Sequence, residues 1–429
     1  MVYPQSRWQL IVLVSVGVMI SYVDRVNLSH ALIPMSKDLG LTTTQQGILL
    51  SSFSWGYVAF MGIGGWLVDR IGPVAASVTA GSLWSLATAA MGIAWGFQSA
   101  LFSRIAVGVG EAPLFPAAAR MVRDNFPIEE RGRATALFDA GSYVGIAISA
   151  PIVVFIMVAY GWRISFIACA TLGLGWAAIF LFFTRRLSHG EAGEMAISNT
   201  PPSFSEVKRL LTNRKVLGAS YGFFCYNYSK SFFLTWFPAY LVSERGFTFL
   251  SVGIVAMLPA MAAIAGEIFA GTLTDRLIKQ NVSVTVARKL PICAGMVLAS
   301  TIALTGMVSS QWAVVAVLSF AFASTIAASP GIWAIPGDIA PSRTYVGTIG
   351  GIQNTFSNIA GIVAPIVTGL IVARTGSFGA ALTVSAVIAI SGALSYWFLV
   401  GELEPLWKGE LSDEQWRGKS LSIEGAVAS

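Results

Sequence analysis

Seven ionisable side chains lie within long apolar stretches of the sequence, where they could bind an ion or carry a proton. They are Asp24, Arg25, Arg104, Glu111, Asp139, Lys230 and Glu267. An ionisable residue near the centre of a bilayer costs about 3 kcal/mol or more, so each of these needs a reason to be there. Arg104 and Glu111 are seven positions apart, two helical turns, and therefore project from one face of their helix.

The signs of these charges indicate two roles: anion binding by the cations and proton transfer by the acids. An arginine suits a carboxylate because its planar fork can bond both oxygens, so Arg25, with Arg104 and Lys230, could hold an organic anion. Asp24 and Glu111 could load and release protons, because burial favours the neutral form of a carboxyl group and a nearby arginine favours its charged form. Competition between the anion and the carboxylates for the same cations would then couple the two fluxes.

The alternative role for these charges is structural. Asp24 with Arg104 is one ion pair that would bridge two helices. For the whole set we favour a substrate or proton path, because charges inside a membrane usually mark such paths. For Asp139 and Glu267 we favour the structural role, since both can be partly hydrated towards the end of their helices.

The elements that hold these residues are predicted to be membrane helices. Of the 429 residues, 55% are hydrophobic and 11% are charged, and the mean hydropathy is +0.71, which excludes a water-soluble fold. Apolar windows bounded by charges or turn residues predict twelve transmembrane helices. They cover residues 8–35, 46–69, 73–95, 98–123, 132–159, 163–184, 216–243, 249–274, 289–308, 311–337, 345–373 and 377–400.

The polar stretch from 185 to 215 divides these spans six and six. We therefore expect an N-terminal six-helix bundle over 1–184, a cytoplasmic linker over 185–215, a C-terminal six-helix bundle over 216–400 and a cytoplasmic tail over 401–429. The string G-x-L-x-D-R occurs at Gly65–Arg70 and again at Gly271–Arg276, at equivalent points of the two halves. The predicted fold is an all-α membrane protein of two pseudo-symmetric bundles with a substrate site between them.

The distribution of Lys and Arg predicts the orientation of the chain. Most of them fall on the side of the two termini, and only Lys37, Arg163, Arg245 and Arg374 fall on the opposite side. Both termini are therefore expected in the cytoplasm, with the protein spanning the inner membrane. The net charge of +6 fits this asymmetry, so no nucleic acid partner is expected.

Motifs for other chemistry are missing from the sequence. The three cysteines have neither disulfide nor metal-ligand spacing, and no nucleotide-binding motif or nucleophile with a neighbouring histidine is found. We expect no metal, no cofactor and no catalytic residues, which disfavours a membrane-embedded enzyme. A monomer is the simplest expected state.

Several longer strings are more specific than hydropathy. They are Tyr22–Leu28 (Y-V-D-R-V-N-L), Gly65–Gly72 (G-W-L-V-D-R-I-G), Arg104–Pro116 (R-I-A-V-G-V-G-E-A-P-L-F-P), Gly161–Arg163 (G-W-R), Leu234–Leu241 (L-T-W-F-P-A-Y-L) and Ile339–Pro341 (I-A-P). On these strings the chain resembles the major facilitator superfamily over all twelve spans, and within it the anion:cation symporter family. One departure is Pro73-Val74, which replaces the basic residues usual after the G-W-L-V-D-R-I-G motif.

The resemblance implies proton-driven or potential-driven movement of organic anions, most commonly sugar acids. It implies Asp24 and Glu111 as protonation sites, Arg25 as a substrate-binding residue and Arg104 as the partner that controls Glu111. We therefore expect proton-coupled symport by alternating access, with a hexonate, hexuronate or aldarate as substrate. An exchanger or exporter on the same fold is the alternative.

Further substrate contacts are expected from both halves. They are Tyr57, Ser142, Tyr226, Asn227, Lys230, Trp333 and Asn354. Ser142 stands where hexonate carriers of the family often have Gln, and Lys230 adds a positive charge that such carriers generally lack. Lys230 could meet a second carboxylate, so a dicarboxylate or an aromatic acid remains an alternative substrate.

Overall fold

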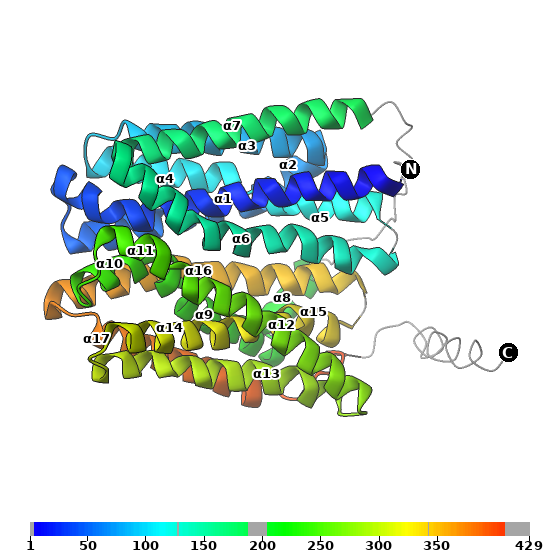
Figure 1. Ribbon diagram of the computed structural model, residues 1–429. Coiled ribbons are helices and arrows are strands. Elements are labelled where there is room, and N and C mark those ends of the chain that lie inside the picture. Colours follow the sequence, from blue (N-terminus) through cyan, green and yellow to red (C-terminus); the bar gives the residue numbers. More distant parts are fainter. Residues whose placement is uncertain (1–3, 127, 188–203, 342, 408–429) are drawn as a thin grey trace.

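The helices of this protein run roughly side by side in two groups (Figure 1). The computed structural model describes residues 4–126, 128–187, 204–341 and 343–407. The first group contains α1 (Pro4–Leu39), α2 (Thr43–Ile71), α3 (Pro73–Gly92), α4 (Phe97–Glu111), α5 (Leu114–Asn125), α6 (Ile128–Tyr160) and α7 (Trp162–Leu187). Within it α1 packs on α6, α2 on α4, and α3 on α7.

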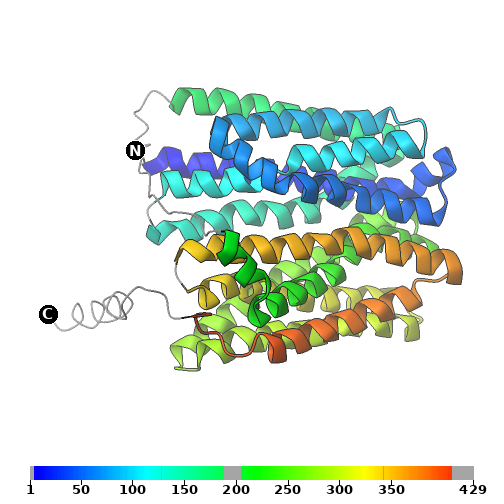
Figure 2. The same ribbon diagram turned by 180° about the vertical axis from the view of Figure 1, so that it is seen from behind.

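The second group follows a short connecting helix, α8 (Phe204–Leu211). It contains α9 (Arg214–Thr235), α10 (Phe237–Ser243), α11 (Phe249–Val255), α12 (Met257–Lys279), α13 (Val284–Ala299), the 3-10 helix η1 (Ser300–Met307), α14 (Gln311–Ala327), α15 (Ser329–Ile339), α16 (Arg343–Thr375), α17 (Gly379–Leu394) and the π-helix η2 (Ser395–Leu399). Here α9 packs on α16, and α12 on α14. The same two groups are seen from behind in Figure 2.

The predicted all-α membrane fold is confirmed. Within the described residues, eleven helical stretches are long and apolar enough to cross a membrane, and each coincides with a predicted span. The remaining predicted span, 216–243, is also helical and forms α9 and α10. Its stretch Cys225–Lys230 carries tyrosine, asparagine, serine and lysine, which makes this helix more polar than the others.

Four of the predicted spans are each interrupted, so that α4, α9, α11 and α14 end before α5, α10, α12 and α15 begin. A proline accounts for each interruption: Pro113, Pro238, Pro259 and Pro330. Proline has no N–H to bond the carbonyl four residues earlier, and its ring clashes with that carbonyl. The interruption at Pro113 matters most, because α4 then ends at Glu111.

The two groups are in close contact at the end of the molecule away from the start of α1. A Cβ added at Gly47 on α2 would lie only 2.7 Å from the carbonyl oxygen of Pro365 on α16. The same carbonyl accepts a hydrogen bond of 3.1 Å from the Trp236 indole. Gly253 on α11 packs less tightly against α6, where an added Cβ would lie 3.2 Å from the Val154 side chain and 3.5 Å from the Ala150 carbonyl oxygen. Glycine thus allows the helix backbones of the two groups to meet at this end.

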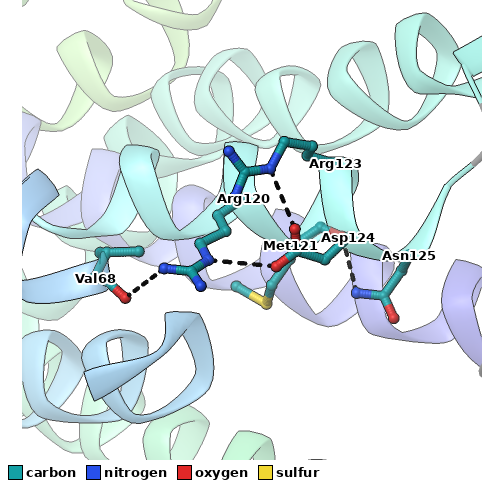
Figure 3. Close-up of polar contacts among 6 residues, drawn as sticks. All are labelled: Val68, Arg120, Met121, Arg123, Asp124 and Asn125. Atoms are coloured by element: carbon teal, nitrogen blue, oxygen red, sulfur yellow. Dashed lines mark hydrogen bonds and ion pairs between the residues drawn. The ribbon is translucent and has the colours of Figure 1, made fainter. Parts of the chain in front are cut away.

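At the opposite end, the G-W-L-V-D-R-I-G motif forms the last turns of α2, which contact α5 within the first group (Figure 3). Arg120 on α5 donates a hydrogen bond of 3.1 Å to the Val68 carbonyl and forms an ion pair of 3.4 Å with Asp124. Arg123 contacts the same carboxylate at 3.2 Å. Arg120 therefore binds the last turn of α2 to α5. In this chain Pro73-Val74 stand after the motif in place of basic residues.

The start of α1 and the end of η2 lie at the same end of the molecule (Figures 1 and 2). Residues 188–203 of the predicted linker and 408–429 of the predicted tail lie outside the described residues. The remaining part of the linker includes α8, which packs on α9 and α16 with Leu210 buried. The boundaries of the two bundles at 184, 215 and 400 stay predictions.

Substituting Gly47 by Ala should destabilise the contact between α2 and α16. The added methyl group would overlap the Pro365 carbonyl, and overpacking of this kind costs about 1–3 kcal/mol. Gly62 is the matched control, because it lies on the same helix and a Cβ there meets nothing within 4 Å. We expect Gly62→Ala to keep or raise the melting temperature in detergent and Gly47→Ala to lower it. Equal melting temperatures for the two variants would contradict the close contact.

Candidate functional site

Arg25 and Glu111 form an ion pair between α1 and α4. The Nε of Arg25 lies 2.6 Å from Oε2 of Glu111. The Glu111 side chain is fully buried and the Arg25 side chain is 16% exposed, so the cation is the partner that solvent can reach. Because α4 ends at Glu111, the break in this helix sets the carboxylate against α1. Loss of either partner would leave an unpaired charge in a poorly hydrated site.

Three aromatic rings surround the Arg25 guanidinium. The ring centroids of Tyr22, Phe53 and Tyr57 lie 4.7, 4.5 and 5.0 Å from its central carbon. Rings at these distances attract a cation through their negative faces. The Nη2 atom of Arg25 has no hydrogen-bond partner in the described part of the chain. The guanidinium is therefore held in place by rings and one carboxylate, and one of its buried N–H groups stays unbonded.

Arg104 contacts the backbone of α1. Its Nη1 and Nη2 atoms donate weak hydrogen bonds to the carbonyl oxygens of Asp24 (3.4 Å) and Arg25 (3.5 Å). The ion pair with Asp24 that was considered as a structural alternative is not formed, and the carboxylate of Glu111 pairs with Arg25. Arg104 therefore ties α4 to α1 at the point where the ion pair sits.

Asp24 is buried without a polar partner. Asp24 is only 1% exposed, and neither of its carboxylate oxygens has a hydrogen bond within the described residues. Thr88 on α3 and Cys169 on α7 lie beside it, and the Thr88 hydroxyl is also without a partner. A buried carboxylate without a partner is costly, whereas a neutral acid is tolerated much more easily.

A second polar cluster joins the two groups of helices. The Tyr143 hydroxyl on α6 donates a hydrogen bond of 3.3 Å to Oε1 of Glu267 on α12. The Lys230 ammonium on α9 lies 5.9 Å from the centroid of the Tyr143 ring. Asp139 and Glu267 are both close enough to interact electrostatically with Lys230. This cluster is thus made by residues from both groups.

The other predicted substrate contacts are spread over the second group and its border. Tyr226 is buried on α9, close enough to Lys230 to interact electrostatically with it. Asn227 donates to the Ser357 carbonyl at 3.1 Å and so joins α9 to α16. Asn354 reaches across to α2, where its Nδ2 lies 3.7 Å from the Met61 sulfur.

Ser142 and Trp333 also make contacts other than those with the charged side chains. The Ser142 hydroxyl is buried and bonds the Asp139 carbonyl of its own helix at 2.6 Å. Trp333 on α15 is 54% exposed and packs edge-on against Phe223, with centroids 5.1 Å apart. The structure brings together Asp24, Arg25, Tyr57, Arg104 and Glu111 in one place, and Tyr226 with Lys230 in another.

Sequence reasoning missed Tyr143 and Thr88. Tyr143 is one helical turn after Asp139, so a search for polar residues at i+4 from each buried charge would have found it. Thr88 gives no such signal, because a single threonine in an apolar helix commonly bonds its own backbone. Only the tertiary structure, in which α3 packs on α7, identifies it as a neighbour of Asp24.

Comparison with known protein families gives one result that covers most of the chain. Residues 14–365 match the model of the Major Facilitator Superfamily. Among solved structures, a bacterial homologue of the human lysosomal transporter Spinster, in an inward-facing and unoccupied conformation, superposes with a TM-score of 0.76. It is 17% identical and the match covers 93% of this chain and 98% of that one, so the likeness concerns the fold.

Curated relatives are closer in sequence. A probable galactarate/D-glucarate transporter of Bacillus subtilis, GudP, is 37% identical over 93% of this chain and 92% of its own length. The probable galactarate/D-glucarate transporter GarP of Escherichia coli K12 is 35% identical, covering 93% and 96%. A D-galactonate transporter of Escherichia coli O6:H1 is 31% identical, covering 93% and 97%.

These relatives are named as transporters and not as enzymes, in agreement with the expectation from the sequence. The resemblance inferred from the Y-V-D-R-V-N-L and G-W-L-V-D-R-I-G strings is confirmed as well. With its many membrane-spanning helices and its match over residues 14–365, this multi-pass membrane protein belongs to the Major Facilitator Superfamily and is an organic-anion transporter.

Proposed function

We propose that the protein imports a sugar-acid anion together with protons by alternating access. The observation that carries this proposal is the ion pair between Arg25 and Glu111, in which the Arg25 side chain is partly exposed and its carboxylate partner is buried. A carboxylate substrate and Glu111 would compete for the same cation. The relatives named for galactarate, D-glucarate and D-galactonate support a sugar acid as the substrate.

The proposed coupling follows from this competition. A proton that reaches Glu111 neutralises it and weakens its bond to Arg25, which then offers both N–H edges to the substrate carboxylate. When the proton leaves, Glu111 is charged again and re-forms its ion pair with Arg25, and the substrate is released. Tyr22, Phe53 and Tyr57 keep the guanidinium in place during the exchange.

Asp24 is proposed as a second proton carrier, on different evidence. Its carboxyl group is buried between α1, α3 and α7 without a hydrogen-bond partner in the described residues. Arg104 contacts the Asp24 and Arg25 carbonyls, so a change at either carboxyl group can be passed to the same stretch of α1. The number of protons moved with each anion would then depend on both acids.

The contacts between the two groups of helices support the alternating-access part of the proposal. They meet through Gly47 and Pro365 at the end opposite the start of α1. With the termini in the cytoplasm, as the Lys and Arg distribution predicts, this would be the outer end. The state described here would then be sealed towards the outside, with Asn354 and Met61 in contact further along α2 and α16.

An exchanger or exporter on the same fold is the second candidate, and an aromatic acid or another dicarboxylate is the second class of substrate. An exchanger would use the same competition at Arg25 but would need a second anion on the opposite side. The direction of coupling separates the two functions, because only a symporter accumulates its anion from an acidic outside.

Uptake into proteoliposomes tests the proposed function directly. With an inward proton gradient, we expect hexonates, hexuronates or aldarates to accumulate, and the accumulation to vanish when the gradient is collapsed. Aromatic acids and short dicarboxylates complete the panel. If no acid moves until a counter-anion is loaded inside, the protein is an exchanger and the coupling role of Glu111 and Asp24 is wrong.

Replacing Glu111 by Gln should separate binding from coupling. The amide resembles the protonated acid, so binding should no longer depend on pH, whereas the wild type should lose up to about tenfold in affinity per pH unit on the alkaline side. Substrate exchange should persist while gradient-driven uptake is lost. Asp24→Asn should also lose gradient-driven uptake.

The matched control for these two variants is Glu130→Gln. Glu130 forms an ion pair of 2.8 Å with Arg7 at the end of the molecule where α1 begins, and both side chains are partly exposed. This variant should transport as the wild type does. Gradient-driven uptake that survives in both Glu111→Gln and Asp24→Asn would overturn the proposed proton carriers.

A further inference from the structure

Lys230 is a cation without a bonded counter-ion at membrane depth. Within the described residues its ammonium group has no hydrogen bond and no ion pair within 4 Å, although it is only partly exposed. Arg25, by contrast, is held by Glu111 at 2.6 Å. The N–H donors of Lys230 are therefore free to bond a ligand that carries a negative charge.

The surroundings of Lys230 are built for an anion that arrives between the two groups of helices. The Tyr143 ring of α6 lies 5.9 Å from the ammonium, and the Tyr143 hydroxyl bonds Glu267 of α12. Asp139 of α6 and Glu267 interact electrostatically with Lys230 but do not form an ion pair with it. The cation is thus balanced from a distance, and its N–H donors stay available.

Tyr22 connects this cluster to Arg25. Its ring centroid is 4.7 Å from the Arg25 guanidinium carbon, and it is also close enough to Asp139 and Tyr143 to interact with both electrostatically. Arg25 is thus beside Tyr22, and Lys230 is beside Tyr143, which is itself a neighbour of Tyr22. A substrate carboxylate on Arg25 would place the other end of an elongated molecule towards Lys230.

We infer that Lys230 and the Tyr143 hydroxyl bind the second carboxylate of a dicarboxylate sugar acid whose first carboxylate is on Arg25. This inference rests on the proposed function and assigns its substrate class. A diacid carries one negative charge more than the corresponding monoacid, and Lys230 is the cation whose N–H donors are open to that second carboxylate. Tyr143 gives up Glu267 as its acceptor and donates to the substrate, so occupancy of the site changes a contact between α6 and α12.

Galactonate and galactarate are the matched ligands for testing this assignment. They share one carbon skeleton and differ only at the end where galactarate has its second carboxylate. Binding to purified full-length protein is measured by calorimetry, which needs neither transport nor a proton gradient. We expect Lys230→Met to weaken galactarate binding by about 10- to 100-fold, as for loss of a charged hydrogen bond, and galactonate binding by less than about threefold.

Two further variants complete the experiment. Tyr143→Phe should weaken galactarate binding by about three- to tenfold and leave galactonate binding unchanged, because one neutral donor is lost. Lys37→Met is the control, since Lys37 is an exposed lysine near the end of α1. It should bind both acids as the wild type does. Unchanged galactonate binding also shows that each variant is folded.

The outcomes separate this inference from the proposed function. If Lys230→Met weakens both acids equally, or neither, Lys230 does not bind the second carboxylate and the inference fails. If the wild type binds galactonate but not galactarate, the inference fails and the proposed transport of a sugar acid stands. If the wild type binds neither these acids nor any other sugar acid, the proposed function itself fails.

Discussion

A carboxylate buried against a single arginine is the constraint on which the rest of this structure depends. Glu111 has no exposure and Arg25 is its ion-pair partner, so while Glu111 is charged the pair must stay together. The interrupted helix α4, the rings around the guanidinium and the contacts of Arg104 with α1 all serve this geometry.

The contacts between the two halves follow a different rule. At one end helix backbones meet through glycine, where a single methyl group would overlap a carbonyl oxygen at Pro365. The halves also meet through longer side chains, such as Tyr143 with Glu267 beside Lys230 and Asn354 with Met61. Side-chain contacts of this kind can be exchanged for contacts with a ligand, whereas backbone packing can only be formed or separated. The charged region is therefore where a substrate can influence how the halves fit together.

The sequence predicted much of this site, for reasons that can be named. Charges stand out against apolar spans, so Asp24, Arg25, Arg104 and Glu111 could be found by hydropathy alone. Which acid pairs with which arginine could not be predicted, because Arg25 could reach Glu111 on α4 and Arg104 could reach Asp24 on α1. Asp139 and Glu267 were given a structural role from their position along their helices. The structure places both in partly exposed positions near Lys230, and their structural role stays a prediction.

The amino-acid sequence by itself determined the number and approximate limits of the membrane helices, because apolar length and bounding charges are local properties. It also identified the family, since strings such as Y-V-D-R-V-N-L do not depend on the packing. Only the tertiary structure decided which cation neutralises which acid and which ones stay unpaired. An ion pair between α1 and α4, 86 residues apart, depends on how helices rotate and break, as at Pro113. That rotation is set by packing over the whole bundle, which no short stretch of sequence contains.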